Sequence, residues 1–493
     1  MTLLSTLGLN FTSITADSRK VSAGSLFLAY PGTHSDGRQY IAQAIAAGAS
    51  AVLWESAVLW ENQDFAWDPA LKVANLGVSQ LKNQVGQIAA EFYQYPSRKL
   101  GMVGVTGTNG KTSVSQWIAQ ALLTLDKKTA VIGTIGNGFI DTDGQGLTEA
   151  SNTTPDAILL QAMLADYAQQ GAESVVMEVS SHGLDQGRVN GVEFDVAVFT
   201  NLTRDHLDYH ETMDAYASAK QKLFYWPNLR MAILNIDDPF GKKVAESLRG
   251  NDLPCMTYGL TEGDVHAREL VLNQYGITMN VVTPQGEAVL AAPVLGRFNA
   301  YNLLAVLSTL LARQVPLNDA VAAIAKIKSV SGRMQQFGGG DKPLVVVDYA
   351  HTPDALENVL MSLREQTQGK LICVFGCGGN RDAGKRPLMG AIAERLADHV
   401  VVTSDNPRSE NPTLIIEQIV SGMTVRPSIV PDRAIAIQQT IKFANKGDIV
   451  LVAGKGHEDY QEVDGIKMPF SDIATAKEAL VTWLPDQEVA VNK

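Results

Sequence analysis

The sequence predicts an α/β protein of three domains. Short apolar runs of strand length alternate with helical patterns over nearly the whole chain, which is typical of α/β architecture. Its 493 residues exceed what one hydrophobic core supports, so two to four domains are expected. From residue 100 onward, nearly every apolar run is followed by a polar or glycine-rich cluster. Such clusters at the carboxyl ends of parallel strands form the ligand crevice of an open α/β sheet.

Three units follow one another along the chain. The first, residues 1–98, contains a predicted strand at Ser25–Tyr30, a helix at Gly37–Gly48 and a strand at Ala51–Trp54. The pattern stops near Tyr95–Arg98, and a new strand begins directly after it. We therefore expect a small N-terminal α/β domain that ends there.

The central unit, residues 99–330, begins with a strand at Leu100. Further predicted strands lie at 129–133, 174–179, 194–199 and 230–235. Pro293–Asn302 is predicted to be a turn that leads into the helix Leu303–Leu311. The third unit, residues 331–493, has apolar strands at 344–347, 371–375, 400–403 and 449–452, separated by helical patterns. That order predicts a parallel sheet with crossover helices.

Composition limits the possible partners. The chain is 45% hydrophobic and 19% charged, as ordinary soluble proteins are. Its net charge of -12 provides no basic field for a nucleic acid polymer or an anionic membrane. No apolar run is long enough to span a bilayer, no signal-peptide pattern opens the chain, and three cysteines are too few for a disulfide framework. We expect a cytoplasmic protein.

Residues 104–112, GVTGTNGKT, predict a phosphate-binding loop between a strand and the helix Ser113–Leu125. Glycines let backbone N–H groups surround phosphate oxygens, and the helix N-terminus adds positive partial charge. Lys111 would reach the β- and γ-phosphates, and the Thr112 hydroxyl a Mg²⁺ ion. Val105 departs from the strict P-loop pattern, where a glycine stands. The alternative is a glycine-rich turn that binds nothing, but the strand–loop–helix context favours a nucleotide.

Four further side chains are candidates for cation chemistry. Glu178 ends an apolar run, where its carboxylate could hold a hard cation together with Thr112. His206 and His210 have the i, i+4 spacing of a helix face, which fits either a metal site or a hydrogen-bonded pair. Lys220 lies in a helical pattern, where a solvated lysine and a functional one look alike.

The motifs as a set resemble the Mur ligases, in the family's order and over essentially the full chain. They are GVTGTNGKTS, SNTTPD (151–156), MEVSSHGL (177–184), NLTRDHLDYH (201–210), GRFNAYN (296–302), SGRMQ (331–335), DYAHTPD (348–354) and DNPR (405–408). The resemblance implies an N-terminal UDP-binding domain, a central P-loop-type ATPase domain and a C-terminal Rossmann-like amino-acid domain. It also implies that ATP activates UDP-N-acetylmuramoyl-L-alanyl-D-glutamate as an acyl phosphate, which an amino acid then captures.

The resemblance also implies a role for individual positions. ATP contacts are implied for Gly107, Thr108, Asn109, Gly110, Lys111, Thr112, Ser113, Asn299, Asn302, Arg333, Asp348 and His351. Contacts to the UDP-muramoyl dipeptide are implied for Ser18, Thr33, His34, Ser35, Asn152, Thr153, Thr154, Ser180, Gln186 and Arg188. Contacts to the incoming amino acid are implied for Arg381, Asp405, Asn406, Pro407, Arg408, Gly454 and Glu458. The implied catalytic residues are Lys111, His206 and Lys220.

Two Mg²⁺ ions are implied, with Thr112, Glu178, His206 and Lys220 as the protein ligands. Lys220 matches a lysine that CO₂ converts to a carbamate in this family. Arg408 predicts meso-diaminopimelate as the incoming amino acid, because a guanidinium can pair bidentately with the distal carboxylate, which lysine lacks. The alternative is that Arg408 is a surface residue after a turn, with no role in binding. We expect a monomer.

Other functions remain open from the sequence. One is a ligase that adds L-lysine. Another is a folylpolyglutamate-synthetase-like ligase, although such a chain should lack the first hundred residues and the DNPR cluster. A P-loop switch or motor, or a non-catalytic binding protein, would show no acceptor-dependent phosphate release.

Overall fold

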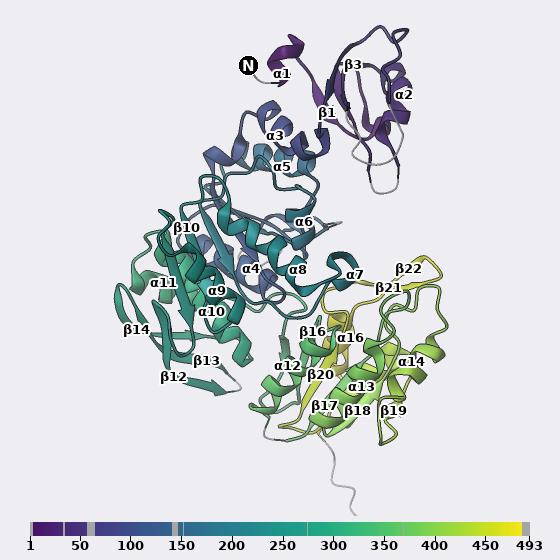
Figure 1. The fold of residues 1–493 in the computed structure, drawn as a ribbon. Coiled ribbons are helices and arrows are strands. Elements are labelled where there is room, and N and C mark those ends of the chain that lie inside the picture. Colours follow the sequence, from purple (N-terminus) through teal and green to yellow (C-terminus); the bar gives the residue numbers. More distant parts are fainter. Residues whose placement is uncertain are drawn as a thin grey trace, which may run out of the picture.

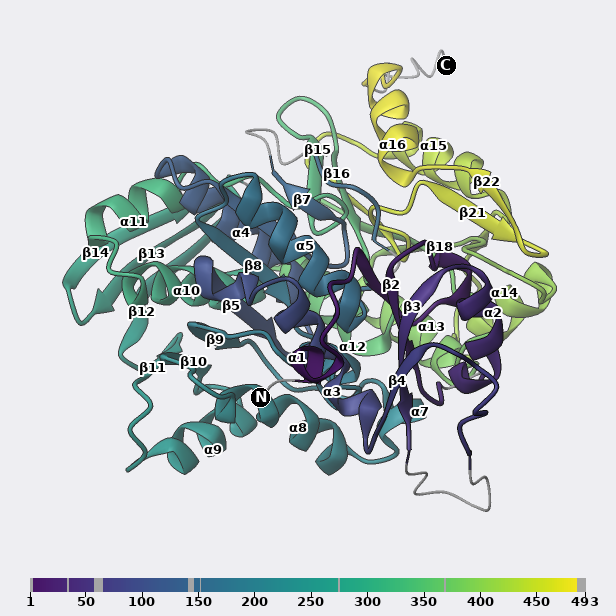
Figure 2. The ribbon, with the colours of Figure 1, turned by 90° about the horizontal axis from the view of Figure 1, so that it is seen from above.

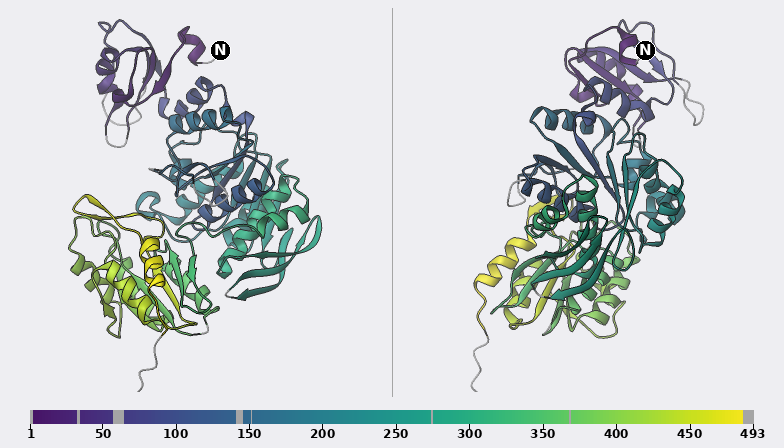
Figure 3. Two further views of the ribbon diagram at one scale, coloured as in Figure 1. Left: turned by 180° about the vertical axis from the view of Figure 1, so that it is seen from behind. Right: turned by 90° about the vertical axis from the view of Figure 1, so that its left-hand side faces the viewer.

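The computed structural model describes residues 3–32, 35–56, 65–140, 146–150, 152–273, 275–367 and 369–485. Three α/β bodies are stacked in the order of the sequence, with the N-terminal and C-terminal bodies at opposite ends (Figures 1 and 3). Figure 2 looks along this stack, with the N-terminal sheet in front. No helix in the described part of the chain is long and apolar enough to cross a membrane.

The N-terminal body is a four-stranded parallel sheet in the order β1-β2-β3-β4. Its elements are α1 (Leu3–Leu7), β1 (Ser13–Thr15), η1 (Ser18–Lys20), β2 (Ser25–Ala29), η2 (Gly37–Tyr40), α2 (Ile41–Ala46), β3 (Ala49–Glu55), β4 (Ala74–Val78), α3 (Leu81–Phe92) and η3 (Pro96–Lys99). Both predicted strands are confirmed, and the predicted helix forms as η2 followed by α2. One face of α3 covers this sheet and also contacts Ala157 of the central body.

The central body is built on a ten-stranded sheet in the order β14-β13-β12-β11-β10-β9-β5-β8-β6-β7. The elements of its first half are β5 (Gly101–Thr106), α4 (Lys111–Thr124), β6 (Thr129–Ile132), β7 (Asn137–Phe139), α5 (Ala157–Gln169), β8 (Ser174–Glu178), α6 (Ser181–Asp185), β9 (Val196–Phe199), α7 (Leu207–His210) and α8 (Met213–Gln221). Because β5 pairs in parallel with both β8 and β9, the carboxyl ends of these three strands meet.

The second half of this body extends the sheet. Its elements are η4 (Lys222–Tyr225), β10 (Met231–Asn235), α9 (Pro239–Leu248), β11 (Cys255–Gly259), β12 (Val265–Asn273), β13 (Gly276–Thr283), β14 (Gly286–Ala292), α10 (Arg297–Ala312) and α11 (Leu317–Ile324). The last three strands are antiparallel neighbours. Alternate strand residues such as Val103 and Met102 point to opposite faces. The face that carries Val103 packs against α4, α10 and α11. The face that carries Met102 packs against α5 and α9.

The predicted turn at Pro293–Asn302 is wrong in its second half, because α10 already begins at Arg297. Gly296 precedes the helix with a positive φ of 93°. The Asn299 side chain donates to the Leu295 carbonyl oxygen at 2.6 Å, and the Asn302 side chain donates to Asn299 at 2.8 Å. Asparagine favours turns in sequence statistics, but here the two amides stabilise the first turns of a buried helix.

The C-terminal body is a six-stranded sheet in the order β15-β16-β20-β17-β18-β19, parallel except for β15. Its elements are β15 (Gln335–Gly338), β16 (Leu344–Asp348), α12 (Pro353–Arg364), β17 (Leu371–Phe375), α13 (Lys385–Leu396), β18 (His399–Val402), α14 (Pro412–Val420), β19 (Ser428–Ile429), α15 (Arg433–Phe443), β20 (Ile449–Ala453), β21 (Tyr460–Val463), β22 (Ile466–Pro469) and α16 (Asp472–Val481). The four predicted strands are confirmed. Helices α12, α13 and α14 cover one face, and α15 and α16 the other.

Candidate active site

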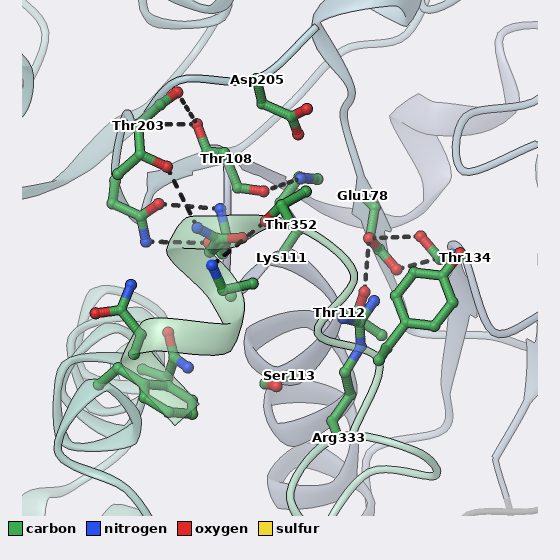
Figure 4. Close-up of a pocket in the computed structure, with 18 of the residues that line it drawn as sticks. Thr108, Lys111, Thr112, Ser113, Thr134, Glu178, Thr203, Asp205, Arg333 and Thr352 are labelled. Atoms are coloured by element: carbon green, nitrogen blue, oxygen red, sulfur yellow. Dashed lines mark hydrogen bonds between the residues drawn. The ribbon is translucent and has the colours of Figure 1, made fainter. Parts of the chain in front are cut away.

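A cavity of about 980 Å³ lies between the central and C-terminal bodies. Its lining comes from the carboxyl ends of β5, β8 and β9, from the first turns of α10, and from C-terminal residues between Arg333 and Val359. Figure 4 shows the loop before α4 and Arg333 from the opposite body facing the same space. A cavity of this size is large enough for a nucleotide with a second substrate beside it.

The loop between β5 and α4 has the geometry of a phosphate cradle. Gly107 and Gly110 have positive φ values of 147° and 84°, and α4 begins directly at Lys111. The Lys111 ammonium donates to the carbonyl oxygens of Gly107 at 2.9 Å and Thr108 at 2.7 Å. Residues 110–113 line the cavity, so the N–H groups of the first helical turn face a space where they suit an anion.

Gly107→Ala is expected to lower the free energy of unfolding by about 3 kcal/mol and to weaken nucleotide binding. A Cβ atom at this position would collide with the Thr200 hydroxyl, and the backbone conformation is unfavourable for alanine. Urea unfolding and ATP titration measure the two effects. The matched control is Gly171→Ala, because Gly171 also has a positive φ but a Cβ atom there would meet nothing within 4 Å. Equal losses in both variants would contradict the collision.

Two lysine ammonium groups converge on one carbonyl oxygen. Lys220, on α8, is 1% exposed and donates to the Gly107 oxygen at 2.8 Å, the same atom that Lys111 contacts. Burial, and then the charge of Lys111, lower the pKa of Lys220 well below its usual value. The structure thus excludes a solvated helix lysine at this position and places the Lys220 amine in the interior.

The Glu178 carboxylate is buried at the end of β8. It accepts hydrogen bonds from the Thr112 hydroxyl at 3.0 Å, and from the backbone N–H and hydroxyl of Thr134 at 2.8 and 3.0 Å (Figure 4). The role of Thr134 was not predicted, although its position directly after β6 is a strand-end position of the same kind. Mg²⁺ prefers carboxylate and hydroxyl oxygens as ligands, so Glu178 and Thr112 fit that ion.

Three histidines pack together beside Lys220. The ring centroid of His182 lies 4.9 Å from that of His206 and 5.4 Å from that of His210. His206 Nε2 lies 3.4 Å from Asp205, a residue that the sequence did not indicate. Burial and the two neighbouring histidines lower the pKa of His182 to about 4. Within the described ranges, no cluster of three or more histidine, cysteine or acidic side chains could hold a metal.

The predicted nucleotide contacts come together from two bodies. Asn299 and Asn302 line the cavity from α10, and Arg333, Asp348 and His351 line it from the C-terminal body. The Arg333 guanidinium lies 4.6 Å from the centre of the Tyr349 ring. Asp348 accepts from the backbone N–H groups of Met334 and Ala350, each at 2.8 Å, which fixes the loop after β16.

The phosphate loop also touches the C-terminal body directly. Asn109 and Thr203 each donate a side-chain hydrogen bond of 3.3 Å to the Asp354 carboxylate. Asp354 lies in the first turn of α12. The two bodies are therefore joined at the place where the phosphates of a nucleotide would lie.

The predicted muramoyl-peptide contacts divide into two groups. Those that line the cavity are Asn152, Thr153, Thr154, Ser180 and Arg188. Gln186 holds Arg188 in place by accepting from its guanidinium at 2.9 and 2.6 Å. Ser18 and Ser35 belong to the N-terminal body and do not line the cavity; Ser18 donates to Gln43 at 3.3 Å. Thr33 and His34 lie outside the described residues.

The predicted amino-acid contacts gather at the carboxyl ends of β17, β18 and β20, outside the large cavity. Asn406 donates to Glu458 at 2.9 Å, and Arg408 donates to the Gly379 carbonyl oxygen at 2.8 Å. Arg408 Nε also lies 3.3 Å from Glu462, a partner that the sequence did not indicate.

The remaining predicted positions lie around this group. A side chain at Gly454 would meet the Asp405 carboxylate at 2.6 Å, so the two are neighbours. Pro407 directly precedes Arg408. Arg381 is exposed and donates to the carbonyl oxygen of its neighbour Asn380 at 3.3 Å.

The fold and this site define a P-loop-type enzyme whose cavity lies between two α/β bodies. Three domain families match the chain: the Mur ligase family catalytic domain over residues 10–93, the Mur ligase middle domain over 105–310, and the Mur ligase glutamate ligase domain over 332–456. The chain belongs to the Mur ligase family.

Individual relatives match over nearly the full length. A UDP-N-acetylmuramoyl-L-alanyl-D-glutamate--2,6-diaminopimelate ligase of Chromobacterium violaceum is 52% identical over 484 residues, covering 98% of this chain and 96% of the relative. The ligase of the same name from Pseudomonas aeruginosa is 51% identical over 474 residues, covering 95% of each chain. A solved structure of a ligase with that name is 38% identical with a TM-score of 0.72, covering 96% of this chain and 95% of its own.

Proposed function

We propose that this protein uses ATP to join meso-2,6-diaminopimelate to UDP-N-acetylmuramoyl-L-alanyl-D-glutamate in peptidoglycan precursor synthesis. One observation carries the proposal. The phosphate loop, Lys220 and the polar group around Thr154 and Arg188 line a single cavity, so a carboxylate substrate can meet the end of a triphosphate there. The relatives that are 52% and 51% identical to this chain are named as diaminopimelate ligases, which supports the proposed substrates.

The chemistry suits this arrangement. A carboxylate is a poor acyl donor, so its oxygen first takes the γ-phosphoryl group of ATP, which gives an acyl phosphate and ADP. An amine of diaminopimelate then attacks the acyl carbon, and the tetrahedral intermediate expels phosphate as the amine loses its proton. Lys111 is placed to move from its two loop carbonyls to the phosphoryl oxygens, where it stabilises the charge of the transition state.

Thr112, Glu178, His206 and Lys220 are the residues that would hold Mg²⁺ in this proposal. Magnesium would neutralise charge on the phosphoryl oxygens. The buried Lys220 amine supports conversion to a carbamate, because only a neutral amine reacts with CO₂ and the lowered pKa favours that form. The product would place a negative group beside Lys111 in place of the Lys220 amine.

Residues 1–98 would bind the UDP moiety, residues 99–330 ATP, and residues 331–493 the amino acid. Ser18 and Ser35 would contact the UDP group from the N-terminal body, which must then approach the cavity. Asp405, Asn406, Pro407, Arg408, Gly454 and Glu458, with Arg381, would receive diaminopimelate. We propose a monomer that acts in the cytoplasm.

The direct test is ATP-dependent phosphate release from UDP-N-acetylmuramoyl-L-alanyl-D-glutamate with meso-diaminopimelate, with L-lysine and with no acceptor. We expect rapid release with meso-diaminopimelate only. A preference for L-lysine would agree with the ligase assignment but would contradict meso-diaminopimelate as the acceptor. Equal release without any acceptor would indicate a P-loop ATPase instead.

A further inference from the structure

Lys455 is a completely buried lysine beside the proposed amino-acid site. It follows Gly454 at the end of β20, and its exposed fraction is 0%. Its ammonium donates to Asn406 Oδ1 at 2.9 Å and to Glu458 Oε2 at 3.0 Å. The Glu458 side chain is 19% exposed, so a ligand can reach the carboxylate although it cannot reach the lysine. Burying an ammonium group costs desolvation free energy, so its hydrogen bonds to Asn406 and Glu458 must compensate for that cost.

Lys455 helps to set the orientation of the Asn406 amide. Asn406 Oδ1 accepts from the Lys455 ammonium and also from the backbone N–H of Glu462 at 3.0 Å. The amide nitrogen must then point to Glu458, to which it donates at 2.9 Å. If the amide were flipped, its NH₂ group would face the Lys455 ammonium and the Glu462 N–H, which are both donors. Glu458 would also lose the hydrogen bond from Asn406. Lys455 and the Glu462 backbone N–H therefore favour the same orientation of the Asn406 amide, and Lys455 is the side chain among the two donors.

Lys455 also fixes the Glu458 carboxylate. Both Lys455 and Asn406 donate to the same oxygen, Oε2. No described residue donates to the other oxygen, Oε1. A partly exposed carboxylate that is held through one oxygen, with the second oxygen free of donors from the described residues, is suited to accept an ammonium group of an amino acid.

We propose that Lys455 is a positioning residue that orients Asn406 and Glu458 to receive an ammonium group of the incoming amino acid. This inference rests on the proposed function, which places diaminopimelate at Glu458. Lys455 itself does not touch the substrate and acts through its two neighbours.

The test is Lys455→Met, with KM measured separately for meso-diaminopimelate, ATP and the UDP-muramoyl dipeptide. We expect the KM for meso-diaminopimelate to rise about tenfold or more, with the other two KM values changed less than about twofold. Lys467→Met is the matched control, because Lys467 is exposed and lies 3.9 Å from the same Tyr460 ring that Lys455 approaches at 5.4 Å. Lys455→Arg keeps two donors and should lie between wild type and methionine.

A double-mutant cycle with Glu458→Gln separates positioning from general damage. If Lys455 acts through Glu458, the double variant is no worse for meso-diaminopimelate than the worse single variant. If all three KM values rise together, or if Lys455→Met equals the Lys467→Met control, the inference is overturned. Lys455→Gln gives the same test should the methionine variant not fold. Wild-type turnover with meso-diaminopimelate tests the proposed function independently of every variant.

Discussion

Lys220→Ala is expected to lower kcat by about 10³-fold, because it removes the group that would carry the carbamate and help hold the metal. Lys220→Arg should be equally inactive, since a guanidinium does not form a carbamate and leaves two cations facing Gly107. Acetate or formate should partly restore the alanine variant by supplying a carboxylate in the space vacated. Steady-state phosphate release with and without these anions measures the effect.

Lys222→Ala is the control for this prediction. Lys222 lies two residues further along, is half exposed and pairs with Asp185 at 3.0 Å. It should leave kcat nearly unchanged. If the Lys220→Arg variant had substantial activity, a carbamate at this position would not be required. A positive charge would then be enough to explain the role of Lys220.

Arg408→Ala is expected to raise the KM for meso-diaminopimelate about 10²-fold, with little effect on the KM for ATP. Arg408 uses Nη1 for the Gly379 carbonyl and Nε for Glu462, and no bond within the described residues occupies Nη2. That edge can receive the distal carboxylate. L-Lysine has no such carboxylate, so its low activity should not fall further. Comparing the two acceptors in both proteins gives the measurement.

Arg395→Ala controls for the loss of an arginine, because Arg395 is exposed and pairs with Glu357 at 2.6 Å, away from the strand ends. Arg408 has a positive φ of 51°, which alanine also tolerates poorly, so the substitution keeps the backbone strain unchanged. Equal losses for the two acceptors would overturn the assignment of Arg408 to the distal carboxylate.

Local motifs explain what the sequence could predict. The phosphate loop is contiguous, so its glycines, Lys111 and Thr112 could be interpreted without knowing the sheet. The strand ends that carry Glu178 and Asn406 were visible for the same reason. Resemblance to a family, rather than spacing, singled out Lys220 from other helical lysines, and burial supplies the physical distinction that the sequence pattern lacked.

The missed residues depend on strand order or on irregular backbone. Thr134 meets Glu178 only because β6 pairs with β8, and Lys455 meets Asn406 only because distant segments converge at one edge of the sheet. The antiparallel strands β12 to β14 were not predicted, although residues 277–281 (ITMNV) alternate apolar and polar side chains in the sequence, as the burial of β13 does. That period of two was the available signal. The helix start at Arg297 depended on two asparagines that sequence statistics assign to turns.

The bonds that Lys111 makes within its own loop have a consequence for the energetics of turnover. The Lys111 ammonium is compensated by the Gly107 and Thr108 carbonyl oxygens of its own loop. Nucleotide binding is therefore an exchange reaction, in which two internal contacts are given up for phosphate contacts, and only the difference appears in the affinity. The same exchange runs backwards when ADP and phosphate leave, so product departure never exposes a bare charge. Such an exchange would moderate the affinity of the loop for ADP and phosphate, and would therefore favour repeated cycles over tight retention of products.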